Sequence, residues 1–169
     1  MKLLDKLEPV HYDVIQGRFK IIRTHAIEGT SVVCNENIVV DNARKIIRDL
    51  VFGDTPIITK LVLGDMGYGA GSPWDEPEPA NGTELKLVNQ LAFVPVTSKA
   101  KIVDEETGRN GIVYTFLMPV DKYNGLSGTL KIVELGLATD TDELFTKKNR
   151  PMLSKDFETQ LEISYTLLF

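Results

Sequence analysis

The chain has few of the residues that most redox, metal and catalytic sites require. It has one cysteine, Cys34, two histidines, His11 and His25, and one tryptophan, Trp74. A single cysteine excludes an intrachain disulfide framework and the multi-thiolate sites that hold structural zinc. The sequence therefore fits a protein that folds in a reducing compartment, with Cys34 as a small buried side chain in a strand.

Long apolar runs and excess positive charge are also missing. No stretch approaches the roughly 20 apolar residues of a membrane-spanning helix, and residues 1–8 are too polar for the core of a signal peptide. The net charge is −5, whereas proteins that bind nucleic acids or anionic membranes need basic surfaces. We therefore expect neither nucleic acid nor membrane among the partners.

Sequence motifs for catalysis and cofactor binding are absent too. The glycines between residues 64 and 71 precede no Gly-Lys-Ser/Thr of a phosphate-binding loop, and the acidic residues of 65–78 lack EF-hand spacing. No Gly-x-Ser-x-Gly nucleophile motif occurs. We expect no enzymatic activity, no cofactor and no metal. A small hydrolase stays open as an alternative, because carboxylates that meet only in the folded chain are invisible in a sequence.

The last eleven residues carry the clearest structural pattern. Apolar side chains occupy every second position, namely Leu161, Ile163, Tyr165, Leu167 and Phe169. A period of two is typical of a strand with one buried face. Leu168 interrupts the polar face, so we expect the tip of this strand to be covered on both sides.

The rest of the chain predicts a mainly β protein with one helix. A helix is expected at about residues 42–51, with Asp41 as its N-cap and Gly53 as its end. One helical turn is expected at 140–145 and a basic loop tip at 147–150. The other expected strands cover residues 18–27, 31–40, 57–63, 85–97, 101–104, 112–119 and 130–137. About eight strands in succession favour an antiparallel β-sandwich or jelly-roll.

Glu134 lies within the otherwise apolar run of residues 132–137. A carboxylate in such a run must be paired, hydrogen-bonded or placed at a sheet edge, because burying it alone is costly. We interpret Glu134 as a structural ion-pair partner of an Arg or Lys from a neighbouring strand or subunit, rather than as a catalytic group.

Two segments stand apart from the strand pattern. Residues 1–17 are an expected N-terminal arm, with apolar Leu3, Leu4 and Leu7, before a single domain at 18–169. Whether the arm packs on its own domain or reaches a neighbouring subunit stays open. The loop at 64–82 is rich in Gly and Pro, and its Tyr68 and Trp74 are candidate interface anchors. Alternatively, Trp74 folds back over the core of its own domain.

Three groups of segments, taken in order, resemble the small virion structural proteins of tailed bacteriophages. They are residues 37–50; 61–67 with 83–85; and 132–137 with 143–145, 153–155 and 159–169. The resemblance implies a non-enzymatic β-sandwich subunit that acts as an oligomer in a virus particle. Residues 1–36 lie outside the resembling segments.

The resemblance does not fix the position in the particle, and we favour a capsid decoration or cement protein, which bridges neighbouring subunits of the shell. Its partners would be the major capsid protein, or tail and collar proteins, and copies of itself. It would be made in the host bacterial cytoplasm and reside in the virion. The expected partner-binding residues are Leu3, Leu4, Leu7, Tyr68 and Trp74. The alternatives are a tail, collar or baseplate component, and a receptor- or carbohydrate-binding module on a tail or fibre.

Overall fold

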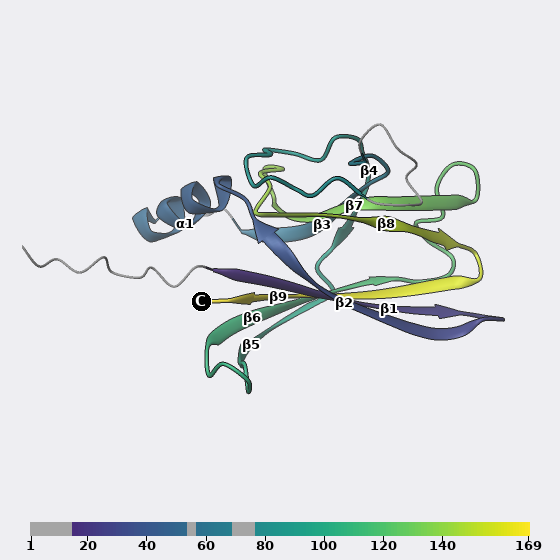
Figure 1. The fold of residues 1–169 in the computed structure, drawn as a ribbon, viewed down its shortest axis with the longest axis horizontal. Helices are drawn as coiled ribbons and strands as arrows, with labels where there is room; N and C mark the ends of the chain where they lie inside the picture. Colours follow the sequence, from purple (N-terminus) through teal and green to yellow (C-terminus); the bar gives the residue numbers. More distant parts are fainter. Residues whose placement is uncertain (1–14, 54–56, 69–76) are drawn as a thin grey trace, which may run out of the picture.

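In the part of the chain that the structure describes, nine β-strands form two antiparallel sheets packed face to face, with one helix beside them (Figure 1). The structure, a computed structural model, describes residues 15–53, 57–68 and 77–169. The elements are β1 (Gln16–His25), β2 (Gly29–Val39), α1 (Asn42–Phe52), β3 (Ile58–Gly64), β4 (Gln90–Pro95), β5 (Ser98–Val103), β6 (Asn110–Met118), β7 (Thr129–Thr139), β8 (Thr146–Asp156) and β9 (Thr159–Leu168). The expected β-sandwich with one short helix is confirmed.

The two sheets share β2. The first sheet, lower in Figure 1, has the order β2-β1-β9-β6-β5, and the second has the order β4-β3-β7-β8. β2 pairs with β1 over most of its length, and its last two residues pair with β8. At the opposite margin the chain passes from β4 to β5, where the amide of Val96 donates to Thr59 and that of Thr97 to Thr115. Backbone contacts therefore link the sheets along both sides.

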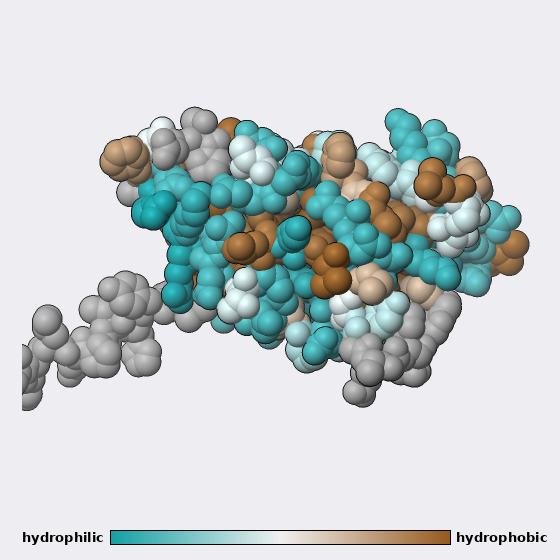
Figure 2. Space-filling model, turned by 90° about the horizontal axis from the view of Figure 1, so that it is seen from above, coloured by the Kyte–Doolittle hydropathy of each residue, from teal (hydrophilic) through white to brown (hydrophobic). Residues whose placement is uncertain are grey.

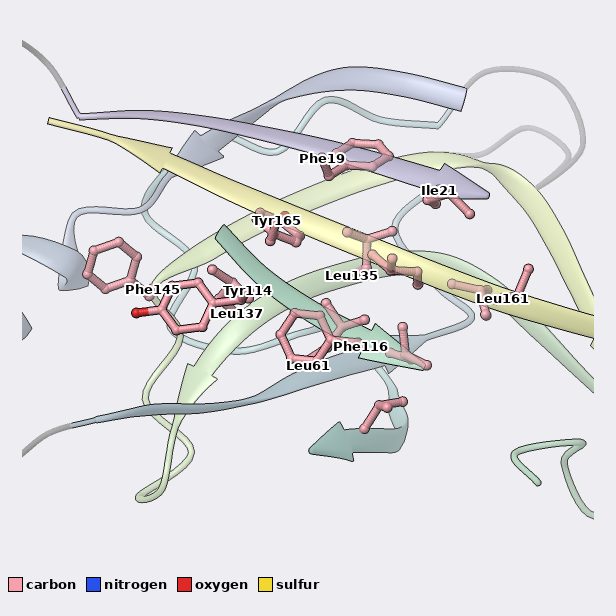
Figure 3. Close-up of a cluster of buried hydrophobic side chains, with 14 of the residues drawn as sticks. Phe19, Ile21, Leu61, Tyr114, Phe116, Leu135, Leu137, Phe145, Leu161 and Tyr165 are labelled. Atoms are coloured by element: carbon pink, nitrogen blue, oxygen red, sulfur yellow. The ribbon is translucent and has the colours of Figure 1, made fainter. Parts of the chain in front are cut away.

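The main core lies between the facing sheets (Figure 3). β9 is central in the first sheet, and its alternate side chains are at most 1% exposed: Leu161, Ile163, Tyr165 and Leu167. β3 and β7 supply the opposing layer, which includes Leu61 and Leu135. Leu168 is fully buried, as its place in the pattern predicts. The prediction for Phe169 was wrong: it lies one residue beyond β9 and is exposed.

Helix α1 covers one end of the sandwich, at the left of Figure 1. Ala43 and Ile46 are buried in the main core, which explains the apolar stripe of the helix. The side chain of Asp41 makes no capping hydrogen bond; its amide instead donates to the carbonyl of Gly82 at 2.8 Å. Gly53 ends the helix with φ 109°, a left-handed conformation that favours glycine.

Three local predictions were wrong, in each case because tertiary contacts decide the structure. The strand predicted at 85–97 is confined to β4, since residues before Gln90 leave the sheet. Residues 147–150 are part of β8 instead of a loop tip. Residues 140–145 form a turn, with Asp142 at φ 64° and a bridge between Ala138 and Leu144, in place of a helical turn.

Cys34 is exposed, contrary to its predicted burial. It lies opposite the exposed Lys20 of β1, and directly paired residues share a face of the sheet, so the Cys34 side chain lies on the outer face of the first sheet. The arm residues Leu3, Leu4 and Leu7 lie outside the described part of the chain. β1 begins at Gln16, two residues earlier than the strand expected from the sequence.

Candidate interaction surface

Of the side chains predicted to bind partners, Tyr68 is the one that the structure describes. It lies half-buried just after β3. Trp74, like the arm leucines, lies outside the described residues. The best-defined surface is instead the one formed by residues 77–89, which we call the covering loop.

The covering loop lies over the outer face of the second sheet, the face turned toward the reader in Figure 2. Its Leu87 is buried against Val62 of β3 and Ala138 of β7, in a small cluster separate from the main core. Val40 and Leu144 complete this cluster. The second sheet is therefore apolar on both faces, which explains why β7 reads as an almost continuous apolar run.

A buried ion pair fastens the loop to the sheet. Glu134 of β7 is 0% exposed and Lys147 of β8 is 2% exposed, and their Oε2 and Nζ atoms are 3.3 Å apart. The Glu134 carboxylate also accepts hydrogen bonds from the amides of Val88 at 2.8 Å and Asn89 at 3.2 Å. Lys147 is 3.5 Å from Glu84 of the loop. The structural ion pair predicted for Glu134 is confirmed, and its second role is to hold loop backbone.

The start of the covering loop is held by Asn149 of β8. Its side-chain amide donates to the carbonyl of Glu78 at 2.7 Å, and the Glu78 amide donates to Gly67 at 3.1 Å. Gly67 has φ +99°, and a Cβ there would lie 2.8 Å from Asn149 and 2.9 Å from Glu134. Glycine is required at this position both for its backbone angle and for the space. One of the glycines of the 64–82 loop thus has a packing role.

The surface that results is rich in exposed apolar side chains. Leu85 is 68% exposed and Val88 64%, although the backbone of Val88 is hydrogen-bonded to Glu134. Ile38, which lies beside Gly82 of the loop, and Met66, which precedes Gly67, are also exposed. Figure 2 shows apolar side chains along the middle of this face, with polar ones around them. Apolar groups on a backbone held in place suit a contact with another protein.

The ionisation of Glu84 makes the stability of the covering loop depend on pH. Burial raises the pKa of Glu84, but hydrogen bonds from the backbone of residues 81–84 and the charge of Lys147 outweigh it and lower the pKa below its ordinary 4.5. A lowered pKa means that the folded state favours the ionised carboxylate. The resulting stabilisation is present above the ordinary value and is lost as the pH falls through the lowered value.

Glu84→Gln is therefore expected to weaken the acid sensitivity of the covering loop. Between about pH 7 and about pH 3, wild-type residues 81–84 should lose protection from amide exchange more steeply than those of the variant. The control is Glu105→Gln at the exposed tip between β5 and β6, which should retain the wild-type profile. An unchanged profile in Glu84→Gln would contradict this role for the carboxylate.

No metal site or membrane-spanning helix is found in the described residues. No three of their His, Cys, Asp and Glu side chains lie close enough together to hold a metal ion. No helix in these ranges combines the length and apolar character needed to cross a membrane.

Comparison of the chain with protein-family models, with curated proteins and with solved structures finds no match. The basis for a functional proposal is thus the fold, the covering loop and the resemblance of the sequence segments.

Proposed function

We propose that the protein is a non-enzymatic structural component of a tailed-bacteriophage virion, which decorates the capsid and bridges neighbouring shell subunits. The observation that carries the proposal is the covering loop. A buried ion pair holds its backbone while Leu85 and Val88 face outward. A surface ordered in advance loses little conformational entropy on binding, so a small domain gains affinity from it.

The resembling segments coincide with the elements that build this surface. Residues 37–50 contain the end of β2 and most of α1, and 61–67 contain most of β3 and Gly67. Residues 132–137 lie in β7 and include Glu134. The resemblance to phage virion proteins therefore includes Gly67 and Glu134, two of the groups that hold the covering loop, although Lys147 and Asn149 lie outside it. This overlap supports a role for the surface in the particle.

The net charge of −5 fits a contact with a basic patch on a larger assembly, since complementary charge speeds association and favours correct partners. In this proposal the protein is made in the host bacterial cytoplasm and binds the major capsid protein and copies of itself. The same features also fit a tail, collar or baseplate position, which is the alternative.

Sedimentation with separated virion parts tests the proposal. The purified protein, mixed with heads or with tails of the phage that encodes it, is expected to sediment with the heads. Leu85→Asp combined with Val88→Asp should reduce binding by at least about tenfold, because a charge in an apolar contact is left without a partner. Val103→Asp, at an exposed site of β5 in the other sheet, is the matched control and should bind normally.

Binding to tails alone would support the alternative position and overturn capsid decoration. A protein that binds neither part would overturn the virion role altogether. Equal loss of binding in the Val103 control would mean that the covering loop is not the contact surface.

A cavity of 530 Å³ gives the carbohydrate-binding alternative one supporting feature. Its lining residues include Tyr123, Asp65, Ser127 and Lys131, and a combination of aromatic and polar residues suits sugars. Binding of the purified protein to a glycan array would favour that reading over decoration.

A further inference from the structure

We propose that the free edge of β2 pairs with the same strand of a second copy, antiparallel about a twofold axis, so that the first sheets of the two copies become continuous. This inference rests on the proposed function in that both require contacts between copies. It identifies the strand that makes one such contact.

β2 has a long unpaired side in the part of the chain that the structure describes. Residues 29–37 pair with β1, and pairing with β8 on the other side begins at Ile38. The backbone groups that point away from β1 in this stretch therefore have no strand partner among the described residues. Such an edge is a template for pairing with another chain.

The other sheet edges in the described part of the chain carry features that discourage strand pairing. β5 presents exposed Lys99 and Lys101, and β4 has six residues and ends at Pro95. β8 pairs with β2 at only two residues, and the rest of that side of β8 contains Pro151. Lysine, proline and short length are the usual protections of edge strands. Residues 29–37 contain neither Lys nor Pro, and they expose Val32 by 54% and Val33 by 37%. β2 is thus the edge whose composition favours pairing.

The free stretch is self-complementary about its centre, Val33. A twofold axis there would set Val33 opposite the same residue of the second copy, with every free position paired. Val33 lies opposite Ile21 of β1, so the pairing would create a row of four branched apolar side chains across the junction. Cross-strand pairs of this kind stabilise antiparallel sheets.

The neighbouring pairs also fit this register. Val32 would face Cys34, and Thr30 would face Glu36. Glu36 is the only charged residue of the stretch, and in this register the two copies of Glu36 do not lie opposite each other. An axis through Cys34 instead would set Thr30 opposite Ile38, where β8 already occupies the edge. The length of the free edge therefore selects the register centred on Val33.

Disulfide trapping tests the register directly. In a Cys34→Ser background, Val33→Cys would place two thiols opposite each other, with Cα atoms about 4.5–5.5 Å apart, which a disulfide can span. Mild oxidation should convert most of this variant to a covalent dimer on a non-reducing gel. Ala100→Cys in the same background, at the exposed lysine-bearing edge of β5, should stay largely monomeric.

Val33→Lys supplies a second measurement that does not depend on oxidation. Val33 is partly exposed, so at a dilution where the wild type is monomeric this variant should keep the wild-type unfolding midpoint. At high concentration it should lose the dimer that sedimentation velocity is expected to show for the wild type. Equal trapping at positions 33 and 100, or a wild-type chain that stays monomeric, would overturn the pairing. These measurements use purified protein without virion parts. A negative result would therefore overturn the β2 pairing alone, and the sedimentation experiment with virion heads would still test the proposed function.

Discussion

Glu134→Ala is expected to lower the free energy of unfolding by about 3–5 kcal/mol. The substitution leaves the ammonium of Lys147 buried at 2% exposure, with Glu84 at 3.5 Å as its remaining ion-pair partner. It also removes the acceptor for the amides of Val88 and Asn89. The remaining contact with Glu84 argues for the lower end of the range. Urea unfolding monitored by circular dichroism measures the loss.

The matched control is Glu162→Gln on the outer face of β9, which should change stability by no more than about 0.5 kcal/mol. Replacing both partners, as Glu134→Leu with Lys147→Met, should recover the part of the loss that comes from the charge left alone, but not the part that comes from the amides of Val88 and Asn89. If Glu134→Ala were as mild as the control, the carboxylate could not be what holds the covering loop.

The same substitution connects stability to the proposed function. Without the carboxylate, the amides of Val88 and Asn89 have no anchor on β7, so residues near Leu85 should exchange their amide hydrogens faster than in wild type. Binding to virion heads should then weaken even at temperatures where the sandwich stays folded, because the surface is no longer held in advance.

The elements that the sequence predicts well are those governed by local spacing. The alternation in β9 follows directly from a central strand with one face on the core, and the stripe of α1 follows from packing against one end of the sandwich. The hairpin of β1 and β2 has β-branched residues on both sides of its turn, and it forms as expected. In each case the spacing of apolar residues within one segment shows which face of that segment is buried, whatever element covers it.

Residues 85–89 of the covering loop were mispredicted as strand because their partners are distant in sequence. Residues 85–89 are as apolar as many strands, yet the amides of Val88 and Asn89 donate to a side chain 45 or more positions away. Lys147 resembles a solvated tip residue until Glu134 and Glu84 are placed beside it. The sequence does show that Glu134 needs a partner, since it stands in an apolar run, but it does not show which one.

The prediction for Cys34 failed because its side chain lies on the outer face of a strand at the margin of the first sheet. Its segment has strand character, and a cysteine in a central strand is commonly buried. The position of β2 at the margin of the first sheet is set by the pairing of β9 with β1 and β6, which sequence spacing does not reveal. The same topology creates the free edge that we propose to be an interface.

Phe116→Ala in β6 is expected to lower the free energy of unfolding by about 3–5 kcal/mol. Phe116 is fully buried in the main core, where it lies opposite Ile163 of β9 in the first sheet and shares the cluster with Leu61 of the second. Removing its ring leaves a cavity in the middle of the main core, between two sheets that are joined at a few residues on each margin, and the surrounding side chains close such a cavity only in part. Unfolding in urea and, separately, in guanidinium gives two values of the change in free energy, so the result does not depend on a single extrapolation to zero denaturant.

The neighbouring residue provides the control, because successive side chains of a strand point to opposite faces. Leu117 is partly exposed on the outer face of the first sheet, so Leu117→Ala should cost about 1 kcal/mol or less. The contrast between positions 116 and 117 therefore tests which side chains of β6 point into the core. It also tests this for β9, because β6 and β9 pair in a fixed register over eight residue pairs. Similar losses at both positions would mean that both faces of this strand are covered, as they would be if the first sheet were buried in a tighter assembly between copies.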